Sequence, residues 1–350
     1  MSNGYRIAYE DMDRILDDLR QEYRIVAPKR FEHAGSDERG YIIRYGDVRS
    51  AEEIIYQEPS DFSPKEIVHP IMQTLLYFQN GECEESQLRD DRKVLIFLHP
   101  CDIHGISRLD NIFLKNGDHE DVYYKRLRDK VKFAVMECGN GWDGCFCVSM
   151  GTNITDDYHM AVRFEDDHIL AEVRDSELQR YFEGEETSEY TPVFVKENTL
   201  KVDVPEITGK QMVRQIAELD YWKQFDDKCL SCGSCNTACI SCSCFDTVDV
   251  IYDETSLDGE RRRKWSSCML DDFSRMAGGH NVRNTAGTRT RFKMLHKVYD
   301  YNQRFGEGKH MCVGCGRCSR KCPEDIDFAG IINDISIKVK ELKEKDETNE

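Results

Sequence analysis

Two cysteine-rich segments in the last third of the chain constrain its fold more than any other feature. Each segment has the spacing C-x₂-C-x₂-C-x₃-C, and a proline directly follows the second one. The first tetrad is Cys229, Cys232, Cys235 and Cys239, and the second tetrad is Cys312, Cys315, Cys318 and Cys322. In such a segment three cysteines bind one iron–sulfur cubane, and the fourth ligates the neighbouring cubane. The spacing therefore predicts two [4Fe–4S] clusters that exchange one ligand each.

This rule assigns the fourth cysteine of each tetrad to the other cluster. Cluster 1 is predicted to bind Cys229, Cys232, Cys235 and Cys322, and cluster 2 is predicted to bind Cys312, Cys315, Cys318 and Cys239. A pair of zinc sites is the alternative, but zinc normally uses two separated C-x₂-C pairs and has no role for a third cysteine at this spacing. The first and third cysteines of each tetrad also have the spacing C-x₅-C, which is half of the sirohaem-binding pattern. A further cysteine lies between them in both tetrads, and this favours the ferredoxin pattern.

The composition favours a globular protein of the cytoplasm. The 350 residues include sixteen cysteines, and in a reducing compartment so many are better explained as metal ligands than as disulfides. Residues 1–30 contain an acidic run at 10–18 and lack an apolar core of signal-peptide length, which predicts a cytoplasmic location. The formal net charge of −18 argues against nucleic acid as a partner. No apolar run reaches the ~18 residues that direct membrane insertion requires.

Four cysteines of the N-terminal part predict a third [4Fe–4S] cluster. The third group consists of Cys101, Cys138, Cys145 and Cys147. These residues lie at the ends of predicted strands, and the ends of neighbouring strands can converge on one point. The alternative is that they pack as small buried side chains, an explanation that suits isolated cysteines better than a C-x-C pair beside two others.

The fourth group of cysteines has a less specific pattern. Cys242, Cys244 and Cys268 belong to it, and His280 follows downstream. They are predicted either to bind a separate metal, such as zinc with His280 as the fourth ligand, or to pack beneath the clusters. Cys83 lies among glutamates and is expected to be an exposed thiol without a role.

The hydrophobic pattern predicts an α+β protein in which a mixed α/β N-terminal domain precedes a two-[4Fe–4S] ferredoxin-like domain. Helices are predicted at about 5–25, 118–130 and 208–225, and strands at 24–28, 94–98, 133–137, 159–164, 169–173 and 192–195. The predicted divisions are a mixed α/β domain at 1–207, a connecting helix at 208–225, a dicluster domain at 226–338 and a charged tail at 339–350.

Nucleotide-binding motifs are missing from the sequence. No G-x-G-x-x-G follows a predicted strand, and no G-x-x-x-x-G-K-[ST] occurs, so neither a nucleotide nor a flavin is expected in this chain. No catalytic residue is predicted either. The chain is expected to carry electrons without a substrate site of its own.

Five blocks spanning both predicted domains carry a family resemblance. They are His99–Asp110, Cys145–Asp157, Cys229–Cys244, Glu260–His280 and Met311–Pro323. Together they resemble the iron–sulfur relay subunit of the anaerobic, NADH-linked sulfite reductase. The cysteine layout, including the sequence HPCDIHG, is also similar to the β subunit of cytoplasmic sulfhydrogenases. The sequence VSMGTN at 148–153 looks more like the sulfite reductase branch.

The resemblance implies an iron–sulfur subunit that relays electrons inside a larger complex. A flavin and [2Fe–2S] subunit would oxidise NADH, and a sirohaem subunit would reduce sulfite to sulfide. Because most of the extra cysteines lie in the shared blocks, the resemblance also strengthens the prediction of a third cluster. Two alternatives remain, namely the same relay in a NiFe hydrogenase or sulfhydrogenase complex, and a structural or iron-storage protein whose clusters never turn over.

The iron content of the protein tests the third cluster directly. Protein purified without oxygen should contain about twelve iron atoms per chain, since each cubane holds four. Metal analysis together with protein quantification gives this ratio. A value near eight would restrict the clusters to the two tetrads.

Overall fold

The computed structural model describes residues 4–34, 39–306 and 308–348. An eight-stranded mixed sheet forms the N-terminal part, in the order β10-β1-β9-β8-β7-β6-β2-β3. Its strands are β1 Gly4–Ala8, β2 Tyr23–Glu32, β3 Tyr41–Asp47, β6 Lys93–Leu98, β7 Val131–Met136, β8 Met160–Phe164, β9 His168–Val173 and β10 Glu186–Thr187. The four neighbours β2, β6, β7 and β8 run parallel to one another, and the outer pairings are antiparallel.

Helices cover both faces of this sheet, and strand β6 shows why. Leu95 and Phe97 belong to one buried cluster with helix α1, Tyr9–Leu19. Ile96 and Leu98 belong to a second cluster with helix α2, Pro100–Leu114. Because successive side chains of a strand point to opposite faces, an apolar run such as β6 must be buried from both sides.

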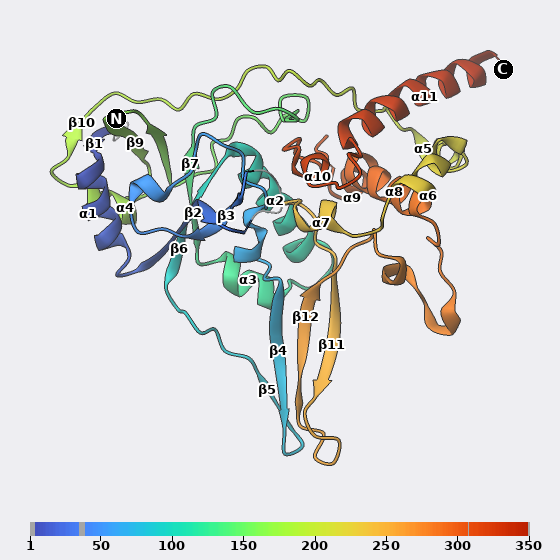
Figure 1. Cartoon of the computed structure of the whole chain (residues 1–350), viewed down its shortest axis with the longest axis horizontal. Coiled ribbons are helices and arrows are strands. Elements are labelled where there is room, and N and C mark those ends of the chain that lie inside the picture. The colour runs from blue at the N-terminus through green and yellow to red at the C-terminus, as the bar shows by residue number, and fades with distance from the viewer. Residues whose placement is uncertain (1–3, 35–38, 307, 349–350) are drawn as a thin grey trace.

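Shorter elements complete this part of the chain. They are η1 Ala51–Glu53, η2 Pro64–Ile67, α3 Val122–Arg128, α4 Ser176–Gln179 and η3 Arg180–Phe182. The segment that follows β10 then runs across the molecule to the C-terminal helices, as Figure 1 shows.

A separate antiparallel sheet of four strands projects from the body (Figure 1). Its order is β11-β12-β4-β5, with β4 Met72–Gln79, β5 Glu82–Glu85, β11 Phe245–Ile251 and β12 Gly259–Trp265. Two hairpins that are far apart in the sequence therefore meet through the pairing of β4 with β12. The basic run of β12 is mostly neutralised, since Arg261 pairs with Asp249 at 2.7 Å and Arg263 with Asp121 at 2.6 Å.

The C-terminal part consists of short helices that surround the cysteine tetrads. They are α5 Gly209–Ala217, η4 Asp220–Lys223, α6 Gln224–Lys228, α7 Ser234–Thr237, η5 Asp271–Ser274, η6 Ala277–Gly279, α8 Ala286–Leu295, the π-helix η7 His296–Asp300, α9 Tyr301–Phe305, α10 Arg317–Arg320 and α11 Phe328–Thr348. One buried cluster joins α5, α8 and α11 through residues such as Ile216, Met294 and Ile332.

The predicted fold class is confirmed, with mixed α/β sheets in the N-terminal part and cysteine tetrads in the C-terminal part. Several element boundaries were wrong. The first helix begins only at Tyr9, because Gly4–Ala8 pairs with β9 as a strand. The helix predicted at 118–130 is limited to Val122–Arg128, since Asp121 caps its start by accepting a hydrogen bond from the Tyr124 amide.

Three further predictions need correction or restriction. The strand predicted at 192–195 is reduced to an isolated bridge between Cys138 and Phe194. The helix predicted at 208–225 is divided into α5, η4 and the start of α6. The predicted tail continues helix α11 as far as Thr348, and residues 1–3 and 349–350 of the predicted divisions lie outside the described residues.

A buried ion pair joins the two parts of the molecule. Arg317, in the second tetrad, contacts Asp102 at 2.8 Å in the first turn of α2, and both side chains are at most 5% exposed. Tyr45 donates a second hydrogen bond to Asp102 at 3.1 Å, and Arg317 also donates to the hydroxyl of Ser60 at 2.8 Å. Every polar group of the pair thus has a partner.

Replacing Asp102 should destabilise the protein strongly. In the Asp102→Ala variant the Arg317 guanidinium stays buried without a counter-charge, which costs about 3–5 kcal/mol. Denaturant unfolding of the variant measures this loss. The matched control is Asp47→Ala, which breaks an exposed pair with Arg24 and should cost about 0–1 kcal/mol. Equal losses in both variants would contradict the assigned role of Asp102.

Candidate iron–sulfur centres

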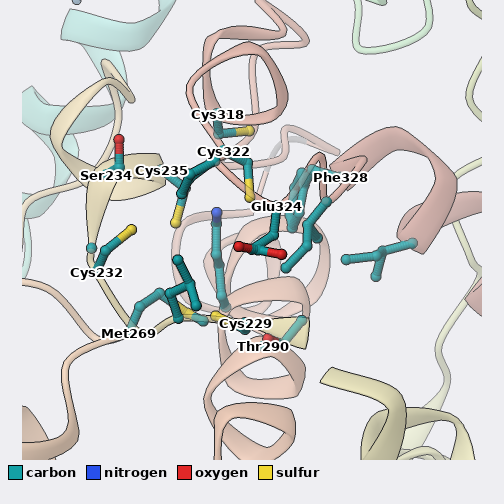
Figure 2. A pocket seen from close by; sticks show the side chains of 16 residues that line it. Cys229, Cys232, Ser234, Cys235, Met269, Thr290, Cys318, Cys322, Glu324 and Phe328 are labelled. Carbon is teal, nitrogen blue, oxygen red and sulfur yellow. The ribbon is translucent and has the colours of Figure 1, made fainter. Parts of the chain in front are cut away.

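The first three cysteines of the first tetrad line a pocket between α7, α8 and the second tetrad. Figure 2 shows the sulfur atoms of Cys229, Cys232, Cys235 and Cys322 around the middle of this pocket. Cys318 also lines it, and apolar side chains such as Met269 and Phe328 enclose it. A pocket with this many sulfur donors and an apolar wall fits an iron–sulfur cluster, because soft thiolate ligands favour such clusters. The spatial grouping agrees with the predicted ligands of cluster 1.

Cys239 lies apart from the rest of its own tetrad and close to the second one. Burial raises the pKa of Cys318 to about 12, and Cys239 is among the thiols that raise it further. Burial likewise raises the pKa of Cys312 and of Cys315, and Cys239 again acts in the same direction on both. Lys297 contacts both Cys239 and the second tetrad, because its Nζ atom donates to the Cys239 Sγ atom at 3.4 Å and its carbonyl oxygen accepts from the Cys312 amide at 3.2 Å. Cys239 therefore lies close to Cys312, and the full ligand set of cluster 2 stays a prediction.

The two tetrads share one backbone conformation. Gly233 and Gly316 both have left-handed dihedral angles, with φ of 76° and 69°, and each precedes a one-turn helix. Ser231 and Gly314 occupy equivalent positions and are both left-handed, with φ of 54° and 66°. Gly314 and Gly316 are both crowded, because a Cβ atom would lie 2.6 Å from the backbone nitrogen of Cys147 at Gly314 and even closer to the carbonyl oxygen of Gly144 at Gly316. Glycine is thus required where the second tetrad meets the third group.

The prediction that the third group lies at strand ends is right for Cys101 and Cys138 and wrong for Cys145 and Cys147, which lie in the loop between β7 and β8. Cys101 follows β6 and Cys138 follows β7, and these two strands are parallel neighbours whose C-terminal ends meet. Burial raises the pKa of Cys138 to about 12, and nearby Cys147 and Cys145 act in the same direction. Burial also raises the pKa of Cys101, an effect to which Cys147 contributes. All four thiols therefore face one region.

The third group also contacts the second tetrad. The Cys145 Sγ atom lies 3.7 Å from the carbonyl oxygen of Cys315, and the Phe146 amide donates to the Gly314 carbonyl at 2.8 Å. Cys147 points toward the Asn198 side chain at 3.5 Å. Burial raises the pKa of Cys147 to about 11, and bound iron would stabilise its thiolate instead.

The fourth group is buried beside the tetrads and is surrounded by lysines. A hydrogen bond from Cys268 lowers the pKa of Cys244 to about 6, and Lys297 and Lys65 act in the same direction. Cys242 hydrogen-bonds to Cys239 and thereby lowers the pKa of Cys239 well below its usual value. The fourth group is therefore adjacent to a predicted ligand of cluster 2.

His280 is not brought to these cysteines. Its side chain is exposed, and its carbonyl accepts a hydrogen bond from the Met276 amide, whereas Cys242 and Cys268 are each only 5% exposed. Across the described ranges, no set of three His, Cys, Asp or Glu side chains is spaced to hold one metal ion. A zinc site that includes His280 stays a prediction without structural support.

Sequence reasoning missed three buried lysines, Lys65, Lys293 and Lys297, that lie among the cysteines. Lysine is mostly a surface residue, so nothing in composition alone marks them. A signal was present in α8 and η7, where Lys293 and Lys297 are four residues apart on one helix face. Cys83 is exposed on β5, as expected.

Comparisons with known proteins agree with the iron–sulfur geometry. Residues 228–326 match the family described as a 4Fe-4S dicluster domain, which implies two [4Fe–4S] clusters. The chain is a distant homologue of the sulfhydrogenase 2 subunit beta of Pyrococcus furiosus. The two are 28% identical over 314 residues, which cover 83% of this chain and 88% of the relative.

A second relative is the F420-dependent formate dehydrogenase subunit beta of Methanocaldococcus jannaschii. It is 20% identical over 254 residues, which cover 66% of this chain and 53% of the relative. No solved structure matches the chain. In the part of the chain that the structure describes, no helix combines the length and apolar character needed to cross a bilayer. The chain is thus an iron–sulfur electron-transfer subunit related to these β subunits, and its predicted identity as a sulfite reductase subunit is not confirmed.

Removing one cysteine of the third group should remove one cluster. The Cys101→Ala variant is expected to contain about four iron atoms fewer per chain than the unaltered protein, the content of one cubane. Metal analysis after anaerobic purification measures the difference. Cys83→Ala is the control and should keep the full iron content, because Cys83 is exposed on β5. Unchanged iron in both Cys101→Ala and Cys147→Ala would rule out the third cluster.

Proposed function

We propose that this chain is the electron-relay subunit of a multi-subunit oxidoreductase of the sulfhydrogenase type. Cluster 1 is assigned to Cys229, Cys232, Cys235 and Cys322, cluster 2 to Cys312, Cys315, Cys318 and Cys239, and the third cluster to Cys101, Cys138, Cys145 and Cys147. The observation that carries the proposal is that Lys297 contacts both Cys239 and the Cys312 backbone, while Cys322 lines the pocket of the first tetrad. Bound cubanes would supply one-electron carriers.

The order of the three cysteine groups supports a relay. Cys318 lines the pocket of the first tetrad, so the two tetrads are adjacent. Cys315 lies beside Cys145 and Cys101, so the second tetrad also adjoins the third group. The second tetrad is therefore the middle of a continuous series. Cys232 is exposed, which supports the first tetrad as the end of the series that a partner would reach.

The protein side chains exclude water from this series. Phe146, Val313 and Ile240 are at most 2% exposed and lie next to the second tetrad or the third group. A dry environment with few compensating dipoles makes a cluster harder to reduce, and hydrogen bonds to sulfur offset this effect. The chain therefore determines the reduction potentials through burial and nearby charge.

The similarity to a sulfhydrogenase β subunit favours a complex of that type. In such a complex the chain would pass electrons between a subunit with a nicotinamide-linked flavin and one with nickel and iron. The second candidate is the anaerobic sulfite reductase, in which the partners would be a flavin and [2Fe–2S] subunit on one side and a sirohaem subunit on the other. The sequence VSMGTN, in the loop between the third group and β8, favours this second candidate.

Anaerobic isolation of the native complex distinguishes these candidates. Nickel in the purified complex supports the sulfhydrogenase type, and a sirohaem absorbance band supports sulfite reduction. Clusters that NADH reduces only when a flavoprotein partner is present exclude a structural or storage role. Clusters that no partner reduces would contradict the relay in either complex.

A cysteine variant tests the relay inside the complex. Cys318→Ser should abolish electron transfer from NADH to the terminal acceptor, because Cys318 lies where the two tetrads meet. NADH diaphorase activity on the flavin subunit should persist, since it does not need this chain. Cys83→Ser serves as the control and should preserve both activities. Loss of diaphorase activity together with the overall reaction would contradict the assigned role.

A further inference from the structure

Three lysine side chains are buried among the cysteines. Lys65 and Lys297 are each 3% exposed and Lys293 is 7% exposed. Burying an ammonium group costs several kcal/mol unless an opposite charge lies close to it. In residues 4–34, 39–306 and 308–348, none of the three forms an ion pair with a carboxylate. Sulfur is therefore the counter-charge available to them.

Lys297 is directed at a predicted ligand of cluster 2. Its Nζ atom donates to the Cys239 Sγ atom at 3.4 Å and to the Ser241 hydroxyl at 2.9 Å. Burial alone lowers the pKa of Lys297, but Cys239, Cys242 and Cys312 together raise it above its usual value. The side chain starts from the π-helix η7, a type of helix that occurs frequently at functional sites.

Lys293 takes the corresponding position beside cluster 1. It lines the pocket of the first tetrad together with Cys235 and Cys318, and both thiols raise the pKa of Lys293. Lys293 and Lys297 are one helical turn apart and point to the same side. Lys293 thus lies where the ligands of the two clusters meet, and Lys297 lies farther along the second tetrad.

Lys65 differs from these two lysines. Its Nζ atom donates to the backbone carbonyls of Asn236 at 2.8 Å and Cys242 at 3.1 Å, and it lies 4.0 Å from the centre of the Trp265 ring. These contacts join η2 of the N-terminal part to the loop after the first tetrad. Lys65 therefore has a packing role that Lys293 and Lys297 lack.

We propose that Lys293 and Lys297 are positioning residues that raise the reduction potentials of the two clusters, Lys293 through Cys235 and Lys297 through Cys239. This inference rests on the proposed relay function. Reduction adds an electron to a cluster, and a fixed positive charge in a medium of low dielectric constant stabilises the added negative charge. Hydrogen bonds to the ligand sulfur act in the same direction.

Redox titration of the purified full chain, followed by electron paramagnetic resonance, tests the proposal. Lys297→Met should shift the midpoint potential of one cluster to a more negative value while the iron content stays unchanged. The Lys297→Gln side chain can still donate a hydrogen bond but carries no charge. The midpoint potential of the same cluster should therefore also become more negative in this variant. Lys297→Arg keeps the positive charge, so its midpoint potentials should stay close to those of the unaltered protein. In Lys293→Met the midpoint potential of cluster 1 should shift more than that of cluster 2.

Lys223→Met is the matched control, because it removes one lysine whose side chain is 76% exposed. Unchanged potentials in Lys297→Met with full iron content would overturn the proposal. Loss of four iron atoms in both neutral variants would also overturn it, since Lys297 would then be needed for cluster assembly. An unaltered chain without clusters would instead contradict the proposed function, so the two failures are distinct.

Discussion

The buried pair of Arg317 and Asp102 is the interaction on which the rest of the arrangement depends. Arg317 lies between two cysteines of the second tetrad, and Asp102 directly follows Cys101 of the third group. A bidentate contact fixes both distance and orientation, so it holds these two cysteine groups at one separation. Charge buried in this way is poor evidence for extra stability, but it specifies a unique packing when every polar group is satisfied.

The fold could be predicted from the sequence where structure is local. The apolar run of β6 and the helical period of α1 are properties of short segments, and both elements exist. The projecting sheet could not be predicted, because β12 is highly charged and shows no apolar alternation. Its position depends on pairing with β4, a contact between distant segments that short-range patterns do not contain.

The candidate site was predictable for similar reasons. Cysteine spacing is local, so the tetrads were recognised, and strand ends indicated that Cys101 and Cys138 converge. The crosswise ligands and the third cluster stay predictions. His280 was grouped with Cys268 by sequence proximity alone, and the structure leaves it exposed. Buried lysines were missed because residue type normally places them at the surface, and only the surrounding thiols make their burial tolerable.

The pairing of β4 with β12 also has a consequence for synthesis on the ribosome. Strand β4 ends at Gln79, and its partner begins only at Gly259. At about 5–20 residues per second, β4 waits roughly 10 to 40 seconds for that partner. During this interval the β4–β5 hairpin has an unpaired edge, which other chains can join. The projecting sheet therefore cannot be completed before β12 has been synthesised.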